Sequence, residues 1–199
     1  MDQQEFKIFT PKKIQRITPN KSVLGLFIPS LFLLFYTDNL QNSDFLHALG
    51  QILMFSAISS GLYFTITKHT RIIPLNGTLD KTLNFGLKKI TIGANQYDLD
   101  DLRKIDFLIQ DYFDKWNYTR DFNPCRSNGV GNKLILTLKN GQIIESNFQL
   151  MYEGQMKKLE TILIQYHGAG VLHFLKLIDL LGIDDYDEIQ EFKKRLPPT

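Results

Sequence analysis

The sequence predicts a membrane protein, in which a two-helix transmembrane hairpin is followed by an α+β domain with an antiparallel sheet and C-terminal helices. Two observations support this prediction. Residues 22–67 contain no lysine or arginine, although the 199-residue chain has 23 of them. After residue 67, strand-like runs come first and helical periodicity comes last, which is the order of an α+β domain and not of an alternating parallel one.

Residues 1–21 precede the stretch without lysine or arginine and carry five basic and two acidic side chains. Lysine and arginine next to a membrane are attracted to anionic headgroups. We therefore expect residues 1–21 to be a basic N-terminal tail on the cytoplasmic side.

Residues 22–67 hold two apolar runs, Ser22–Tyr36 and Phe45–Thr67, which are separated by the polar loop Thr37–Asp44. The second run gives about 34 Å of helix, enough for a hydrocarbon core of about 30 Å. The first gives only about 22 Å, and Pro29 is expected to kink it, so a re-entrant first helix remains an alternative. A cleaved signal peptide is disfavoured because no small-x-small cleavage site follows the first run. A helical hairpin of a soluble protein is also disfavoured, because such a hairpin normally has a charged outer face.

The charges around the hairpin predict its orientation. Basic residues lie on both flanks, whereas the intervening loop contains Asp38 and Asp44 and no positive charge. The positive-inside rule then places both chain ends in the cytoplasm. The single cysteine, Cys125, fits a reducing compartment. Together with heavy use of Ile, Lys and Asn, which is typical of AT-rich bacterial genomes, this predicts a multi-pass protein of a bacterial inner membrane.

Small residues recur at four-residue spacing in the second apolar run. Such spacing permits close helix packing, either on the first helix or between copies in a homo-oligomer. The residues concerned are Ser56, Ala57, Ser60 and Gly61. Because no Asp, Glu, Lys or Arg lies deep in the run, an ion-coupled transporter is disfavoured.

Residues 68–166 are predicted to form a β-rich domain. Asn140-Gly141 readily takes the positive φ angles of a two-residue hairpin turn. A Gly-Ala-Asn turn suggests a second hairpin, and Pro74 suggests an edge strand or a turn around it. The predicted strands are Leu87–Ile92, Gln96–Leu99, Lys104–Phe113, Lys133–Leu138 and Gln142–Phe148, with an edge strand or turn in Arg71–Leu79.

Helical signals follow residue 148. Met156, Leu159, Leu163 and Tyr166 recur at helical spacing, and the glycines of residues 167–170 predict a helix end. Further helices are expected over Val171–Leu181 and from Asp184 or Asp185 to Arg195. Residues 167–199 are therefore predicted to be a C-terminal helical extension.

Part of this pattern resembles a known family. The segment reads Ile-Thr-Ile-Gly, then Tyr97-Asp98-Leu99-Asp100-Asp101-Leu102, then Lys104-Ile105-Asp106-Phe107, with two apolar helices before it and a helix after the last hairpin. It resembles bacterial membrane-anchored proteins with a pleckstrin-homology-like (PH-like) domain, over about Leu75–Tyr166. The resemblance implies a non-enzymatic binding or scaffolding module on a curved sheet, with protein or lipid partners. The chain departs from it in having the extra helices after Val171 and five or six countable strands where the family has seven.

No motif predicts catalysis, a cofactor or a metal site. The stretch Gly129–Lys133 lacks the phosphate-loop spacing, His167 and His173 match no metal-ligand spacing, and Asp184–Glu188 lacks the central glycine of a calcium loop. Residues 68–199 carry eighteen basic and seventeen acidic side chains, so nucleic-acid binding is not expected.

Two segments are candidates for partner binding. Tyr112–Asn132 is long for a strand connection and rich in aromatic and basic residues, which dominate interface hot spots. Val171–Leu181 is so apolar that it must be covered by its own domain, a partner or a membrane. The candidate residues are Tyr112, Trp116, Tyr118, Arg120, Phe122, Arg126, Phe174 and Leu175. The aromatic residues of the first segment fit a membrane surface or the end of a core equally well.

The leading functional hypothesis is a membrane-anchored, non-enzymatic scaffold that binds a protein partner, as a subunit of an inner-membrane complex. One alternative is a lipid- or membrane-surface-sensing module, with Lys88, Lys89, Arg120 and Arg126 on headgroups. A second is an accessory subunit of a transporter or membrane enzyme. The sequence leaves open the partner, the oligomeric state and whether the first helix spans fully.

Overall fold

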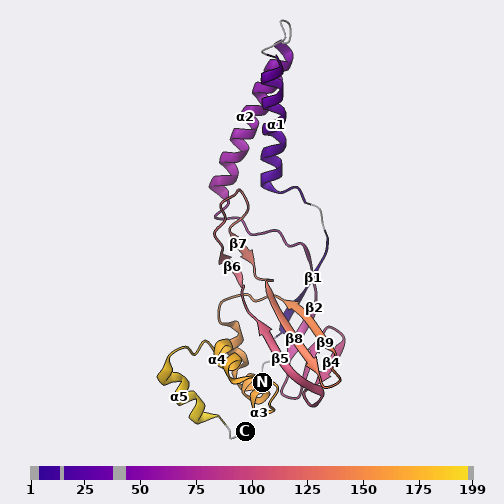
Figure 1. The fold of residues 1–199 in the computed structure, drawn as a ribbon, viewed down its shortest axis with the longest axis vertical. Helices are drawn as coiled ribbons and strands as arrows, with labels where there is room; N and C mark the ends of the chain where they lie inside the picture. Colours follow the sequence, from indigo (N-terminus) through magenta and orange to yellow (C-terminus); the bar gives the residue numbers. More distant parts are fainter. Residues whose placement is uncertain (1–4, 14–15, 38–43, 197–199) are drawn as a thin grey trace. The chain divides into compact units, whose positions relative to one another are not determined.

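The computed structural model describes residues 5–13, 16–37 and 44–196, which divide into two compact units (Figure 1). Among these residues, the sheet unit comprises 5–13, 75–115 and 128–196. The hairpin unit comprises 16–37, 44–74 and 116–127. Each unit is therefore built from segments that are far apart in the sequence.

The sheet unit contains a seven-stranded sheet in the order β4-β3-β2-β1-β9-β8-β5. Every neighbouring pair for which a register is defined runs antiparallel. The strands are β1 (Glu5–Pro11), β2 (Gly77–Phe85), β3 (Lys89–Ile92), β4 (Asn95–Asp98), β5 (Leu102–Leu108), β8 (Asn132–Leu138) and β9 (Ile143–Phe148). A separate two-stranded sheet pairs β6 (Phe113–Trp116) with β7 (Arg126–Asn128).

Strand β1 lies in the middle of this sheet, although it precedes both apolar helices in the sequence. It pairs with β2 on one side, with Phe6 opposite Leu83, and with β9 on the other, with Ile8 opposite Phe148. Phe6 is 1% exposed, and its ring packs edge-on against the rings of Phe85 and Phe148 at 5.5 and 5.8 Å. The predicted basic tail over residues 1–21 thus differs from the structure, which has a core strand there.

The strand was missed because only one of its faces is apolar. Phe6 and Ile8 point into the core, while Glu5, Lys7 and Thr10 are exposed between basic neighbours. In a charged N-terminal segment this two-residue alternation is too short to stand out.

The two predicted hairpins are confirmed, as β3–β4 and β8–β9. The turn at Asn140-Gly141 differs in detail from the predicted two-residue turn. Only the glycine has a positive φ, of +87°, and the Leu138 N–H donates to the Gln142 carbonyl at 2.8 Å, so the loop holds the three residues 139–141. Two strand predictions are wrong. The strand expected over Lys104–Phe113 covers Leu102–Leu108, because the Asn132 side chain then takes the N–H groups of residues 110 and 111. In Arg71–Leu79, where an edge strand or turn is expected, Ile72 forms an isolated bridge with Arg126, and β2 begins only at Gly77, as an interior strand beside β1.

The C-terminal helices cover the sheet and complete its core. They are η2 (Gln155–Leu159), α3 (Glu160–Gly168), α4 (Phe174–Leu181) and α5 (Tyr186–Arg195). The buried Tyr166 hydroxyl donates to the Gly86 carbonyl at 2.8 Å, and burial raises the pKa of Tyr166, so the donor stays protonated. Leu163, Leu177 and Phe192 belong to the same core as Phe6. Residues after 167 are thus part of the sheet unit rather than a separate extension.

The hairpin unit contains α1 (Pro19–Thr37) and α2 (Asp44–Thr67), of 19 and 24 residues. These give helices of about 28 and 36 Å. By length and composition both are able to cross a membrane, and 11% of the apolar window of each is buried. A core helix of a soluble protein would be mostly buried. The centre of the predicted polar loop, residues 38–43, lies outside the described residues.

The small residues of α2 play different roles. Gly50 and Ala57 lie two turns apart and are buried; a Cβ at Gly50 would lie 3.1 Å from Leu34 Cγ of α1. Ser56 is half-buried and donates to the Ile52 carbonyl of its own helix at 2.8 Å, and Ser60 is also half-buried. Packing within the hairpin therefore accounts for the small residue at Gly50.

The position of Phe6 yields a stability prediction. Replacing Phe6 by Ala empties a packed site between two phenylalanines and is expected to lower the free energy of unfolding of the sheet unit by about 3–5 kcal/mol. Denaturant unfolding of the detergent-solubilised protein measures this. Lys7→Ala, on the exposed face of the same strand, is the matched control and should have little effect. If this segment were a tail detached from the sheet, neither substitution would change the free energy of unfolding.

Candidate interaction surfaces

The loop between β6 and β7 is attached to the start of α1. The side chain of Asn20 makes two contacts with it: Nδ2 donates to Asp121 Oδ2 at 2.9 Å, and Oδ1 accepts from the Phe122 N–H at 3.0 Å. The Asn123 N–H and then the Asn20 amide hold the pKa of the Asp121 carboxyl below its ordinary value. The carboxylate is therefore anionic at neutral pH and accepts hydrogen bonds from the loop and from α1.

The same loop is attached to the end of α2. Lys68 Nζ donates to the Thr119 carbonyl at 3.2 Å, and the Cys125 N–H donates to the Lys68 carbonyl at 2.8 Å. Arg71 Nη2 donates to the carbonyls of Phe64 at 3.3 Å and Phe122 at 3.0 Å. Both cations are thus used inside the hairpin unit, and the loop is fixed to the base of both helices.

The structure divides the predicted partner-binding residues of this loop. Phe122 is half-buried and its ring faces Gly61, where an added Cβ would lie 3.6 Å from Phe122 Cζ. Arg126 Nε donates to the His69 carbonyl at 2.8 Å. These two residues therefore make internal contacts.

The other residues of the set are more accessible. Trp116 and Tyr118 are 53% and 70% exposed, and their ring centroids lie 6.2 Å apart. Arg120 is exposed in the same loop. Tyr112 belongs to the sheet unit instead, where it is half-buried with Lys115 Nζ 5.8 Å from its ring centroid.

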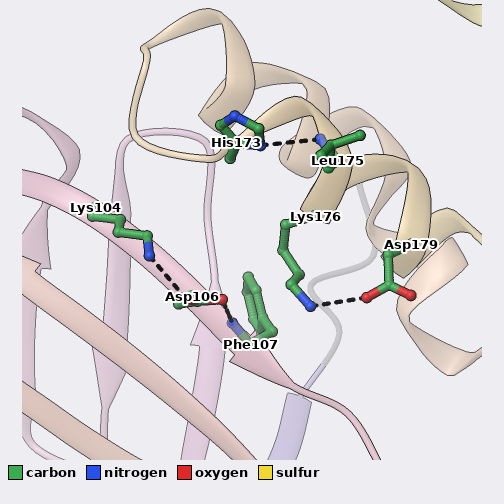
Figure 2. A network of polar contacts seen from close by, with 7 residues as sticks. All are labelled: Lys104, Asp106, Phe107, His173, Leu175, Lys176 and Asp179. Atoms are coloured by element: carbon green, nitrogen blue, oxygen red, sulfur yellow. Dashed lines mark hydrogen bonds and ion pairs between the residues drawn. The ribbon is translucent and has the colours of Figure 1, made fainter.

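A second surface lies between β5 and α4 (Figure 2). Figure 2 shows one ion pair on each element: Lys104 with Asp106 at 3.0 Å on β5, and Lys176 with Asp179 at 2.9 Å on α4. Burial alone would raise the pKa of Asp106, but hydrogen bonds from Lys104 and Phe107 and the charge of Lys104 hold it below the ordinary value. The residues line a shallow groove of about 500 Å³.

The two helical candidates lie beside this groove. Phe174 is half-buried, with its ring 5.8 Å from that of His167, and it packs on the domain core. Leu175 is exposed and lines the groove. The apolar character of this helix is thus largely explained by its own domain, which buries Leu177, Ile178, Leu180 and Leu181.

The edge of β5 beside this groove is already occupied. The Ile105 N–H donates to the Val171 carbonyl at 2.7 Å, and the Phe107 N–H donates to Asp106 Oδ1 at 2.9 Å. Residues two apart in a strand direct their main-chain groups to the same side. A further strand could therefore pair here only by displacing both contacts, which is one way that proteins protect an edge.

A third surface is a cleft between β1 and β9, with a volume of about 750 Å³. The pairing between these strands ends at Phe9 and Asn147. Continuing that register would place Pro11 opposite Glu145, and proline has no N–H to donate. Beyond this point both strands line the cleft, together with Lys81 of β2 and the turn at Gly93.

The β9 side of this cleft presents an open strand edge. The Gln149 N–H donates to the Lys7 carbonyl of β1 at 2.9 Å, and residues 142, 144 and 146 pair with β8 on the other side. By the two-residue alternation, the main-chain groups of Ile143 and Glu145 point to the same edge of β9, which borders the cleft at Glu145. Among the described residues, β1 does not pair with Ile143 or Glu145.

Ser146 adds a buried polar group to the cleft. It is 6% exposed and lines the cleft, and its Oγ has no hydrogen-bond partner among the described residues. A buried hydroxyl without a partner is costly, and an incoming ligand that supplied one would recover that cost. The sequence analysis missed this site; Pro11, a residue that ends strand pairing, was its one visible signal.

Comparison of the chain with protein-family models, with curated proteins and with solved structures finds no match.

The attachment of the β6–β7 loop yields a prediction about Cys125, which is buried in it. Asn20→Ala removes two hydrogen bonds, worth about 1–3 kcal/mol together, and should speed the reaction of Cys125 with a thiol reagent roughly 5- to 100-fold by favouring local opening. Lys21→Ala, the exposed neighbour on α1, should leave the rate unchanged. Equal rates for Asn20→Ala and the native protein would show that the loop is held by other contacts.

Proposed function

We propose that this protein is anchored in a membrane by α1 and α2 and that its sheet unit binds an extended segment of a protein partner. The pairing of β1 with β2 limits how the two helices can be placed in a membrane. One sheet cannot lie on two sides of a bilayer. Both ends of the hairpin must therefore be on one side, so the two helices cross together or not at all.

The surface of the hairpin favours crossing. Many of its large apolar side chains are exposed, among them Phe32, Phe55, Ile58, Leu62 and Ile66. An apolar surface of this extent is not normally left in water. At about 28 Å, α1 nearly matches a hydrocarbon core of about 30 Å, so a full crossing by both helices is the proposal.

The basic residues that flank both helices favour a cytoplasmic sheet unit in a bacterial inner membrane. The main sheet has seven strands and is followed by helices. Six of these strands lie within Leu75–Tyr166, the segment that resembles PH-like domains, and β1 adds a seventh from before the hairpin. The strand number and the helix after the last hairpin support the proposed PH-like character of the domain. We therefore keep the non-enzymatic scaffold as the function.

The cleft between β1 and β9 is the best supported site for the partner. Its main-chain groups at Ile143 and Glu145 are spaced to pair with an extended peptide, whereas the corresponding groups of β5 are in use. Addition of a strand to an open edge is a common mode of peptide recognition. Binding there would also offer a partner to Ser146 Oγ.

Substitution of Ile143 by proline tests this site. The N–H of Ile143 points to the open edge of β9. Ile143 is also the first residue of β9, where proline is tolerated, so the fold should survive. We expect proteins that co-purify with the full-length native chain from mild detergent to be lost with Ile143→Pro, and cross-links from a photoreactive residue at position 145 to reach them.

Leu175→Ala is the matched control on the other surface and should retain the same companions. Loss of companions with Leu175→Ala but not with Ile143→Pro would move the site to the groove between β5 and α4. Absence of any cross-link from position 145 in the native membrane would reject the cleft.

A further inference from the structure

We propose that the β6–β7 loop lies in the headgroup layer of the membrane, where Trp116 and Tyr118 bind the lipid interface. The proposal rests on the membrane anchorage proposed above. It gives this loop a lipid partner, whereas the sequence analysis assigned it first to a protein partner.

The position of the loop follows from its contacts with the hairpin. It is held by Asn20 in the first turn of α1 and by Lys68 directly after the last turn of α2. These are the two ends from which the chain leaves for the sheet unit. In a helix pair that crosses a bilayer, such ends lie at the boundary between hydrocarbon and headgroups, in a layer about 5–7 Å thick on each side.

The side chains that the loop leaves exposed have the chemistry of that boundary. Tryptophan and tyrosine are enriched there because each combines an apolar ring with a polar group. Trp116 and Tyr118 are more than half exposed, and Ile17 just before α1 is 80% exposed. Lys21 and Arg120 are exposed cations of the same unit and suit anionic headgroups.

The charged side chains at the attachment points of the loop are hydrogen-bonded within the hairpin unit. Lys68 and Arg71 donate to loop and helix carbonyls. The Asp121 carboxylate accepts hydrogen bonds from Asn20 and from the Asn123 side chain. Burial of Phe122 against α2 also gives the loop an apolar contact with the hairpin, so its position is fixed before any lipid is bound.

Trp116 is the only tryptophan of the chain, so its own fluorescence tests the proposal. The full-length protein is reconstituted in phosphatidylcholine vesicles with bromine atoms placed either near the headgroups or near the chain ends. We expect Trp116 emission to be lost with the shallow bromines and largely kept with the deep ones. Its emission should also shift to shorter wavelength than that of a water-exposed tryptophan.

A second variant separates this proposal from the anchorage itself. Trp116→Phe combined with Phe55→Trp moves the tryptophan to the exposed middle of α2 and should be quenched by the deep bromines. If that variant is quenched and Trp116 is not, the hairpin is inserted and the headgroup placement of the loop is wrong. If neither is quenched, the anchorage fails and the headgroup placement fails with it.

Discussion

Strand β1 pairs with β2 on one side and with β9 on the other, and this pairing determines how the rest of the chain is arranged. The hairpin connects β1 to β2, so the two strands meet only after the chain has passed through both apolar helices. The Lys12 N–H donates to the Asn76 carbonyl at 3.0 Å, which brings the chain segments before α1 and after α2 together. Phe6 then joins the main core. The hairpin and the sheet are therefore not consecutive in the chain: the two helices are inserted between adjacent strands of the sheet.

The pairing of β1 with β2 is longer than its pairing with β9. Ile8 pairs with both β2 and β9, whereas the pairing with β9 ends at Phe9 and that with β2 continues to Pro11. Beyond Phe9 the edge of β9 at Glu145 has no partner among the described residues of β1, and Pro11 has no N–H to donate to it. In the proposed function, the departure of β1 from β9 opens the binding cleft. The hairpin unit uses side chains instead: Asn20, Lys68 and Arg71 bond the β6–β7 loop to the helix ends.

The elements defined by local chemistry could be predicted from the sequence. Asn140-Gly141 specifies its turn, Asp185 caps α5 by accepting from the N–H groups of residues 187 and 188, and the uncharged run identifies α1 and α2. The elements defined by distant partners could not. Glu5–Pro11 and Gly77–Phe85 are strands because they pair with each other across 65 intervening residues, a relation that no local pattern contains. Likewise, Ile143 and Ser146 become a candidate site only where β1 departs.

The most direct measurement is the side of the membrane on which the ends of the hairpin lie. With Cys125 replaced by Ser, single cysteines at Lys13, Asp44 and Asn76 are labelled with a membrane-impermeant thiol reagent in sealed vesicles. Because β1 and β2 belong to one sheet, positions 13 and 76 should react from the same side and position 44 only from the other. Labelling of 13 and 76 from opposite sides would contradict the shared sheet. Labelling of all three from one side would contradict the membrane hairpin.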